Sequence, residues 1–125
     1  MVAVEVANRS GVEVEEEAAV ALARRVLADE GIEDGELGLH FVGPEEMRTL
    51  KREHLGVDEV TDVLSFPIDE RERVEPGVPR QLGDVILCPQ VTCDRWRGPL
   101  VHGLLHLLGY DHGSEMERRE ERWTE

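Results

Sequence analysis

Three histidines near the end of the sequence have a spacing that suits a metal site. His102 and His106 are four residues apart in an apolar run, so on a helix their side chains lie on one face, about a turn apart. Gly109 follows them, and because glycine accepts a positive φ it lets the chain turn and bring His112 back toward the pair. Three imidazoles with an open fourth position are the ligand set of a catalytic zinc. We therefore expect His102, His106 and His112 to bind one zinc ion per chain.

The alternative to metal binding is that His102 and His106 form a buried, hydrogen-bonded pair on an apolar helix. The third histidine and the glycine of the turn favour the metal site instead. The same ligand spacing occurs in metalloproteases with the motif H-E-x-x-H-x-x-G-x-x-H. Those enzymes place a glutamate, their general base, directly after the first histidine, where this chain has Gly103. Because the ligands are kept and the base is missing, we expect no peptide hydrolysis.

The elements that must position these histidines alternate along the chain between strands and helices. Alternating or continuous apolar residues predict strands at residues 2–6, 37–41, 62–66 and 84–88. Helical spacing predicts helices at residues 14–30, 44–55 and 99–108, each followed by glycine. Ser114 and Glu117 form an S-x-x-E pattern that predicts a capping box and a last helix running to Trp123. This alternation predicts an α/β fold with a single small mixed sheet packed with helices, and residues 68–81 are predicted to form a loop.

Length and composition fit one domain spanning residues 1–125. No apolar run approaches the roughly 20 residues that span a bilayer, and the first residues lack the pattern of a signal peptide. The two cysteines are too few for a disulfide framework and indicate thiols in a reducing compartment. We therefore expect a soluble, cytoplasmic protein.

The net charge of −14 argues against binding a polyanion over a broad surface. The charge is unevenly distributed, however. Ten acidic residues lie between Glu5 and Glu36 and five more between Glu115 and Glu125, whereas residues 71–101 carry five arginines against four acids. Net charge alone therefore leaves the substrate class open.

Three segments, in order, resemble the signature of the YbeY family, bacterial zinc-dependent endoribonucleases of ribosomal RNA maturation. They are TDVLSFP (residues 61–67), LGDVILCP (82–89) and VHGLLHLLGYDH (101–112). The resemblance implies a zinc-bound fold with a zincin-like metal-binding helix and turn. It also implies cleavage of single-stranded RNA, 3′-end maturation of 16S ribosomal RNA and ribosome quality control. The implied partners are single-stranded RNA, ribosomal RNA and the small ribosomal subunit, with no membrane partner, and we expect a monomer.

The chain departs from the YbeY pattern in two places. The family usually carries a tyrosine-arginine pair before TDVLSFP, and the aligned residues here are His54 and Leu55. The segment between Cys88 and His102 is also shorter than in the family, by about three helical turns of 3.6 residues. Two arginines in that shortened segment, Arg95 and Arg97, are candidates to supply the missing positive charge.

Zinc held by three neutral imidazoles polarises a phosphoryl oxygen and lowers the pKa of bound water to about 7. We predict His112, Asp62 and Asp84 as catalytic residues, with the two aspartates as candidate general bases. The alternative for Asp62 is a cap at the start of a strand, and the alternative for Asp84 is a residue of a turn. Asp111 is expected to orient a ligand histidine. Two other functions stay open. One is a non-catalytic ribosome assembly factor with a structural zinc, and the other is a metal-dependent hydrolase of a different substrate.

Overall fold

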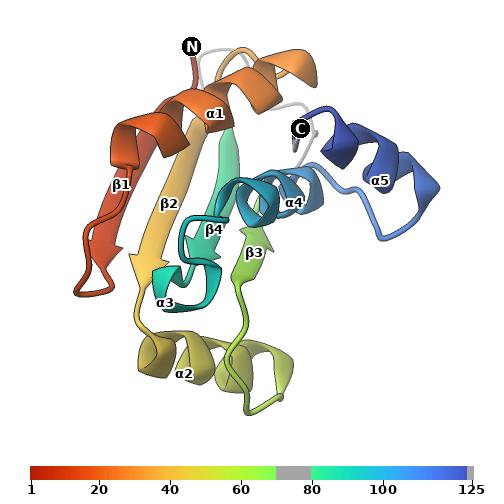
Figure 1. Ribbon diagram of the computed structural model, residues 1–125. Coiled ribbons are helices and arrows are strands. Elements are labelled where there is room, and N and C mark those ends of the chain that lie inside the picture. The colour runs from red at the N-terminus through yellow and green to blue at the C-terminus, as the bar shows by residue number, and fades with distance from the viewer. Residues whose placement is uncertain (70–79, 124–125) are drawn as a thin grey trace.

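Four strands form one mixed sheet in the order β1-β2-β4-β3 (Figure 1). They are β1 (Ala3–Arg9), β2 (Glu36–Val42), β3 (Val63–Pro67) and β4 (Gln81–Leu87). β2 is parallel to both β1 and β4, whereas β3 runs antiparallel to β4. The computed structural model describes residues 1–69 and 80–123, so most of the loop predicted at 68–81 lies outside the described residues. The predicted α/β class with a single small mixed sheet is confirmed.

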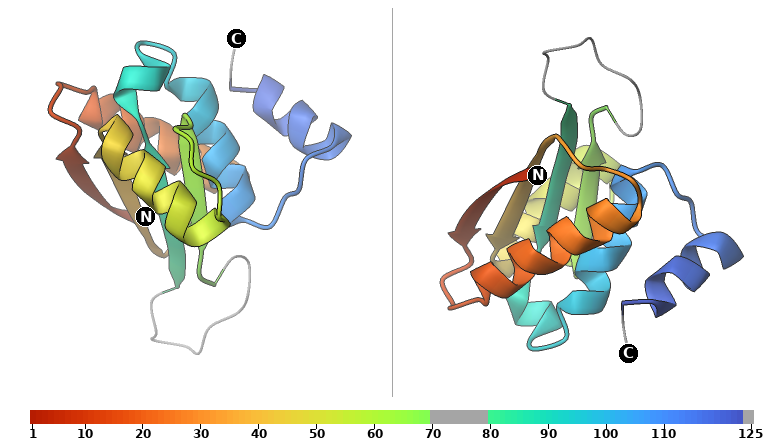
Figure 2. Two further views of the ribbon diagram at one scale, coloured as in Figure 1. Left: turned by 90° about the horizontal axis from the view of Figure 1, so that it is seen from below. Right: turned by 90° about the horizontal axis from the view of Figure 1, so that it is seen from above.

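The helices lie on both faces of this sheet (Figure 2). In the described part of the chain they are α1 (Glu16–Asp29), α2 (Pro44–Leu55), α3 (Pro89–Thr92), α4 (Arg97–Leu107) and α5 (Ser114–Glu121). Successive residues of a strand point to opposite faces, so Val85 and Leu87 join the larger core beneath α1 and α4. Ile86 lies between them in the strand and packs with Met47 of α2 on the other face. None of the described helices is long and apolar enough to cross a bilayer.

Helix α4 packs closely on β3 and β4 because it presents a glycine to them. A Cβ atom on Gly103 would lie 2.9 Å from Cγ1 of Val85 and 3.0 Å from Cγ2 of Val63. The Ser65 hydroxyl donates a hydrogen bond of 2.9 Å to the Gly103 carbonyl. The position that carries the base in the metalloproteases therefore faces the sheet in this chain, and a larger side chain there would push the helix away.

The sequence-based expectation for the start of the last helix was wrong. Ser114 is the first helical residue, Gly113 occupies the N-cap position, and no side chain caps the helix. Gly113 has a φ of 155°, which side-chain-bearing residues rarely adopt. Helix α5 thus begins at Ser114, one residue earlier than it would if Ser114 were its N-cap. Helix α5 ends at Glu121, before the expected end at Trp123, and α4 begins two residues before the expected Pro99.

Candidate metal centre

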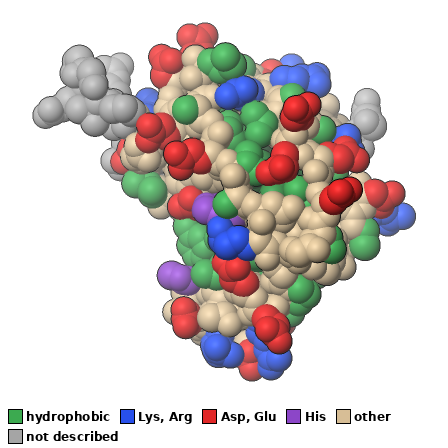
Figure 3. All heavy atoms as spheres, turned by 90° about the vertical axis from the view of Figure 1, so that its left-hand side faces the viewer, with side chains coloured by type: hydrophobic (Ala, Val, Ile, Leu, Met, Phe, Trp, Pro, Cys, Tyr) green, Lys and Arg blue, Asp and Glu red, His purple; other side chains and the backbone are tan. Residues whose placement is uncertain are grey.

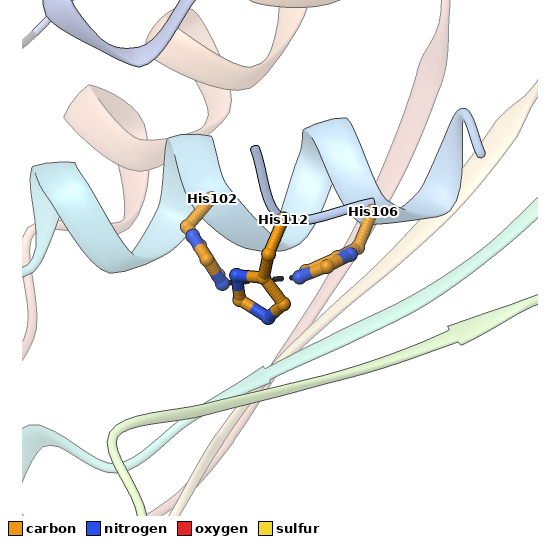
Figure 4. Close-up of side chains that lie close together, drawn as sticks. All are labelled: His102, His106 and His112. Atoms are coloured by element: carbon orange, nitrogen blue, oxygen red, sulfur yellow. Dashed lines mark hydrogen bonds between the residues drawn. The ribbon is translucent and has the colours of Figure 1, made fainter. Parts of the chain in front are cut away.

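His102 and His106 project from one face of α4, and His112 returns to them from the following turn (Figure 4). Gly109, with a φ of 95°, makes the turn that the sequence predicts. The ring centroids of the three histidines are 4.6, 5.1 and 4.7 Å apart. One nitrogen from each ring lies within 4.8 Å of the other two. The structure therefore brings together the three histidines that the sequence predicts as ligands.

The donor set and its spacing fit a divalent ion. Nε2 of His102 and Nε2 of His106 are 3.1 Å apart. Ligand nitrogens around a tetrahedral zinc, each about 2.0–2.1 Å from the metal, are about 3.3 Å apart. A small movement of these two rings would complete such a site, and the three histidines are the residues that would hold the ion.

Hydrogen bonds to the other ring nitrogens hold two of the rings in place. Nδ1 of His102 lies 2.6 Å from Oε1 of Glu120 in α5, and Nδ1 of His106 lies 2.9 Å from the carbonyl oxygen of Tyr110. Because a carbonyl oxygen only accepts, the proton of neutral His106 is on Nδ1 and the lone pair of Nε2 points to the shared centre. Partners of this kind orient metal-binding histidines and raise their basicity.

Glu120 was not predicted from the sequence, and Asp111 was the residue expected to orient a ligand histidine. A signal for Glu120 was available: it lies four residues after Met116, the buried residue of α5, and therefore on the same inward face of the helix. Asp111 is exposed and lines the cleft described below. Which of the acidic residues in the last helix reaches a histidine depends on how that helix packs against α4.

Burial lowers the pKa of His106 below its usual value, and the neighbouring His102 lowers it further. The hydrogen bond to the Tyr110 carbonyl and the charge of Asp111 act in the opposite direction without cancelling the shift. His106 therefore stays neutral to a lower pH than a free imidazole. Since only the neutral ring can bind a metal ion, protons compete less with the metal at this position.

A buried glutamate connects the turn after α4 to the rest of the fold. The side chain of Glu30, at the end of α1, is 2% exposed, and Arg119 of α5 contacts it at 2.6 Å. The Tyr110 hydroxyl donates a hydrogen bond of 2.8 Å to the same carboxylate. The guanidinium of Arg119 lies 5.1 Å from the centre of the Tyr110 ring. This network fixes the turn that supplies a carbonyl to His106 and leads to His112.

The histidines lie in an open cleft of about 1110 Å³. One wall is the end of α2 with β3 and the residues before it, and the other is α4 with the turn after it. All three histidines, Glu120 and Asp111 line this cleft. Its size and openness suit an extended polar substrate more than a small enclosed molecule.

Comparisons with known proteins place the chain in a family. The model of the endoribonuclease YbeY family matches residues 5–124. The chain belongs to this family. It is 39% identical to the endoribonuclease YbeY of Salinispora tropica and 40% identical to that of Micrococcus luteus. These alignments cover 94% of the chain and 87% and 84% of the relatives, respectively. A solution structure from Thermotoga maritima has the same fold, with a TM-score of 0.61 at 22% identity, covering 99% of this chain and 87% of that one.

The two aspartates predicted as catalytic in this YbeY family member lie in different places. Asp62 lines the cleft, directly before β3. Asp84 is not among the cleft residues: it shares a face of β4 with Ile86, away from α4, and its carboxylate lies 2.9 Å from Nε2 of His40. The structure thus does not bring Asp84 together with the three histidines, because alternate residues of β4 face opposite sides of the sheet.

The two arginines considered as substitutes for the YbeY family's arginine do not reach the cleft either. Arg97 pairs with Glu15 at 3.5 Å, and its guanidinium lies 4.4 Å from the centre of the Trp96 ring. Neither Arg95 nor Arg97 is among the residues that line the cleft. Leu55 does line it, with 57% of the residue exposed, so the position is open to a substrate but carries no charge.

Proposed function

We propose that this chain is a zinc-dependent endoribonuclease that cleaves single-stranded RNA. The observation that carries the proposal is the convergence of three histidines, two of them held by Glu120 and a backbone carbonyl, in an open cleft. Three imidazoles with an open fourth position are the ligand set of many catalytic zinc ions. Membership of the endoribonuclease YbeY family supports RNA as the substrate.

In this proposal, His102, His106 and His112 hold the ion at the centre of the cleft. A zinc ion bound there supplies a Lewis acid next to the scissile phosphodiester. Glu120 and the Tyr110 carbonyl keep two of the rings directed at it. Asp62 lines the cleft and is our candidate for accepting a proton from the attacking group. We assign no step to Asp84, because its carboxylate lies beside His40 and is not among the cleft residues.

The resemblance to the YbeY family supports a more specific role. We propose that the substrate is ribosomal RNA and that the reaction contributes to 3′-end maturation of 16S RNA and to ribosome quality control. The partner would be the small ribosomal subunit in the cytoplasm, with the chain acting as a monomer. The net charge of −14 argues against RNA contact over a broad surface, so we propose that contact is confined to the cleft. On the face drawn in Figure 3, acidic side chains are widespread and the basic ones are scattered among them.

The proposal is tested with the zinc-loaded chain and end-labelled RNA. Single-stranded RNA should be cut internally, and duplex RNA of the same sequence should be cut much more slowly. His112→Ala should abolish cleavage without unfolding the chain, because His112 is exposed and belongs to the ligand set. His54→Ala is the matched control: His54 lines the same cleft but lies outside the ligand set, so zinc content should stay at one ion per chain. Equal RNA cleavage by wild type and His112→Ala would refute the proposal.

A second function, a non-catalytic assembly factor with structural zinc, is favoured by Leu55, which puts an apolar side chain where the family usually has arginine. Zinc-loaded protein that binds small ribosomal subunits but leaves single-stranded RNA intact would support this alternative.

A further inference from the structure

The cleft around the histidines has a shortage of positive charge. Among the described residues that line it, Lys51 of α2 is the one lysine or arginine, against Asp62, Asp111 and Glu120. An RNA strand in the cleft brings one negative charge per nucleotide. Lysine and arginine contacts to phosphates supply most of the sequence-independent affinity for nucleic acids. Among the described residues of the cleft, Lys51 is therefore the lysine or arginine that can contact an RNA phosphate.

Lys51 is positioned for such a contact. Its side chain is only 15% exposed, so the carbon chain packs against the protein, and Nζ contacts Oε1 of Glu59 at 2.6 Å. Lysine side chains commonly bury their carbon chain in this way while the ammonium group reaches solvent. Leu55 lies one helical turn further along α2 and also lines the cleft. Lys51 thus lies on the same wall of the cleft as Leu55.

The partner of Lys51 is itself largely in solvent. The side chain of Glu59 is 59% exposed and is not among the cleft residues. Because the Glu59 carboxylate is in solvent, water screens its attraction to the ammonium group, and screened pairs contribute at most about a five-fold change in an equilibrium constant. The ammonium group has three donors, and a phosphate can therefore take one of them or displace the carboxylate at small cost.

We propose that Lys51 binds a backbone phosphate of RNA in the cleft and that Glu59 competes with the phosphate for its ammonium group. This inference rests on the proposed function, since it names the residue that holds the substrate of the same site. It assigns opposite effects to the two partners of one ion pair. Removing the lysine charge weakens RNA binding, and removing the glutamate charge strengthens it.

The test measures the affinity of the zinc-loaded chain for a fluorescein-labelled ten-nucleotide oligouridylate with 2′-O-methyl groups. Fluorescence anisotropy is recorded at several salt concentrations, and a gel confirms that the RNA stays intact. One phosphate contact to a single strand changes the slope of log K against log salt by about 0.7. Lys51→Gln should reduce the slope by that amount and weaken binding about five-fold at 0.1 M salt. Lys51→Arg should retain most of the affinity.

The chain offers matched controls in the neighbouring ion pair. Arg48 of the same helix pairs with Asp58 at 2.6 Å, both side chains are about half exposed, and neither lines the cleft. Arg48→Gln and Asp58→Asn therefore make the same charge changes outside the cleft. Glu59→Gln should raise RNA affinity more than Asp58→Asn does, by up to about five-fold. In the Lys51→Gln background, that difference should disappear.

Two results would overturn the inference. One is that Lys51→Gln weakens binding no more than Arg48→Gln, and the other is that Glu59→Gln raises affinity equally with and without Lys51. Cleavage assays separate these failures from failure of the proposed function. If the wild-type chain cuts single-stranded RNA but either result holds, only the role of Lys51 is wrong. If the zinc-loaded wild type neither binds nor cuts RNA, both proposals fail.

Discussion

The carboxylate of Glu120 lies 2.6 Å from Nδ1 of His102 and thereby joins the last helix to the candidate metal centre. Both side chains are less than one-third exposed, so the contact is partly shielded from solvent. A carboxylate on the outer nitrogen of a ligand histidine fixes the orientation of the ring and increases its basicity. Helix α5 therefore orients a histidine of the site. Among the described residues, the group that could hold a metal ion contains no residue of α5.

Glu120→Ala is expected to weaken zinc binding about 10- to 100-fold, the usual effect of removing such a partner. Competition with a chromophoric chelator would measure the affinity. Glu121→Ala is the control, because Glu121 is the next residue of α5 and is exposed. If both variants bind zinc as tightly as the wild type, the Glu120 contact does not support the metal.

Tyr110→Phe is expected to lower the free energy of unfolding by about 1–3 kcal/mol, because it removes a hydrogen bond to the buried carboxylate of Glu30. The value should lie near the lower end, since Arg119 still pairs with that carboxylate. Urea denaturation of the metal-free chain would measure it, with an unchanged m value confirming that the folded state keeps its compactness. A change below about 0.5 kcal/mol, the level of an ordinary surface substitution, would contradict the role assigned to this network.

Gly103→Ala is expected to destabilise the fold although alanine is the better helix former. The added methyl group would lie 2.9 Å from Val85 and 3.0 Å from Val63. Overpacking of this kind costs about 1–3 kcal/mol, against a gain of about 1 kcal/mol in helix propensity. Thermal denaturation should show a net loss of about 0–2 kcal/mol. An increase in stability of about 1 kcal/mol would mean that the helix has room to move from the sheet.

Leu55→Arg is expected to strengthen binding to single-stranded RNA and to steepen its salt dependence. Leu55 lines the cleft and is 57% exposed, so an arginine there can add one phosphate contact without disturbing the core. The slope of log K against log salt should change by about −0.7. Val57→Arg is the control, since Val57 is also exposed, at 41%, but does not line the cleft. Equal gains in the two variants would show only a general effect of net charge.

The cluster of three histidines could be predicted from the sequence because its arrangement is local. His102 and His106 are one helical turn apart, and a glycine at residue 109 is sufficient to bring His112 back. The strands and the longer helices were predicted for the same reason, since periodicity of 2 or 3.6 residues depends only on neighbouring residues.

Tertiary packing decided the residues that support the centre and those that do not. Glu120 contacts His102 across 18 residues and Tyr110 contacts Glu30 across 80, distances over which sequence spacing carries no geometric information. Asp84 looked like Asp62 in sequence, an aspartate at the start of a strand, yet its side chain lies on the face of the sheet opposite α4. The side of the sheet on which a strand side chain lies depends on how the whole chain buries its apolar surface. The local pattern determines the cluster of histidines, and that burial determines its surroundings.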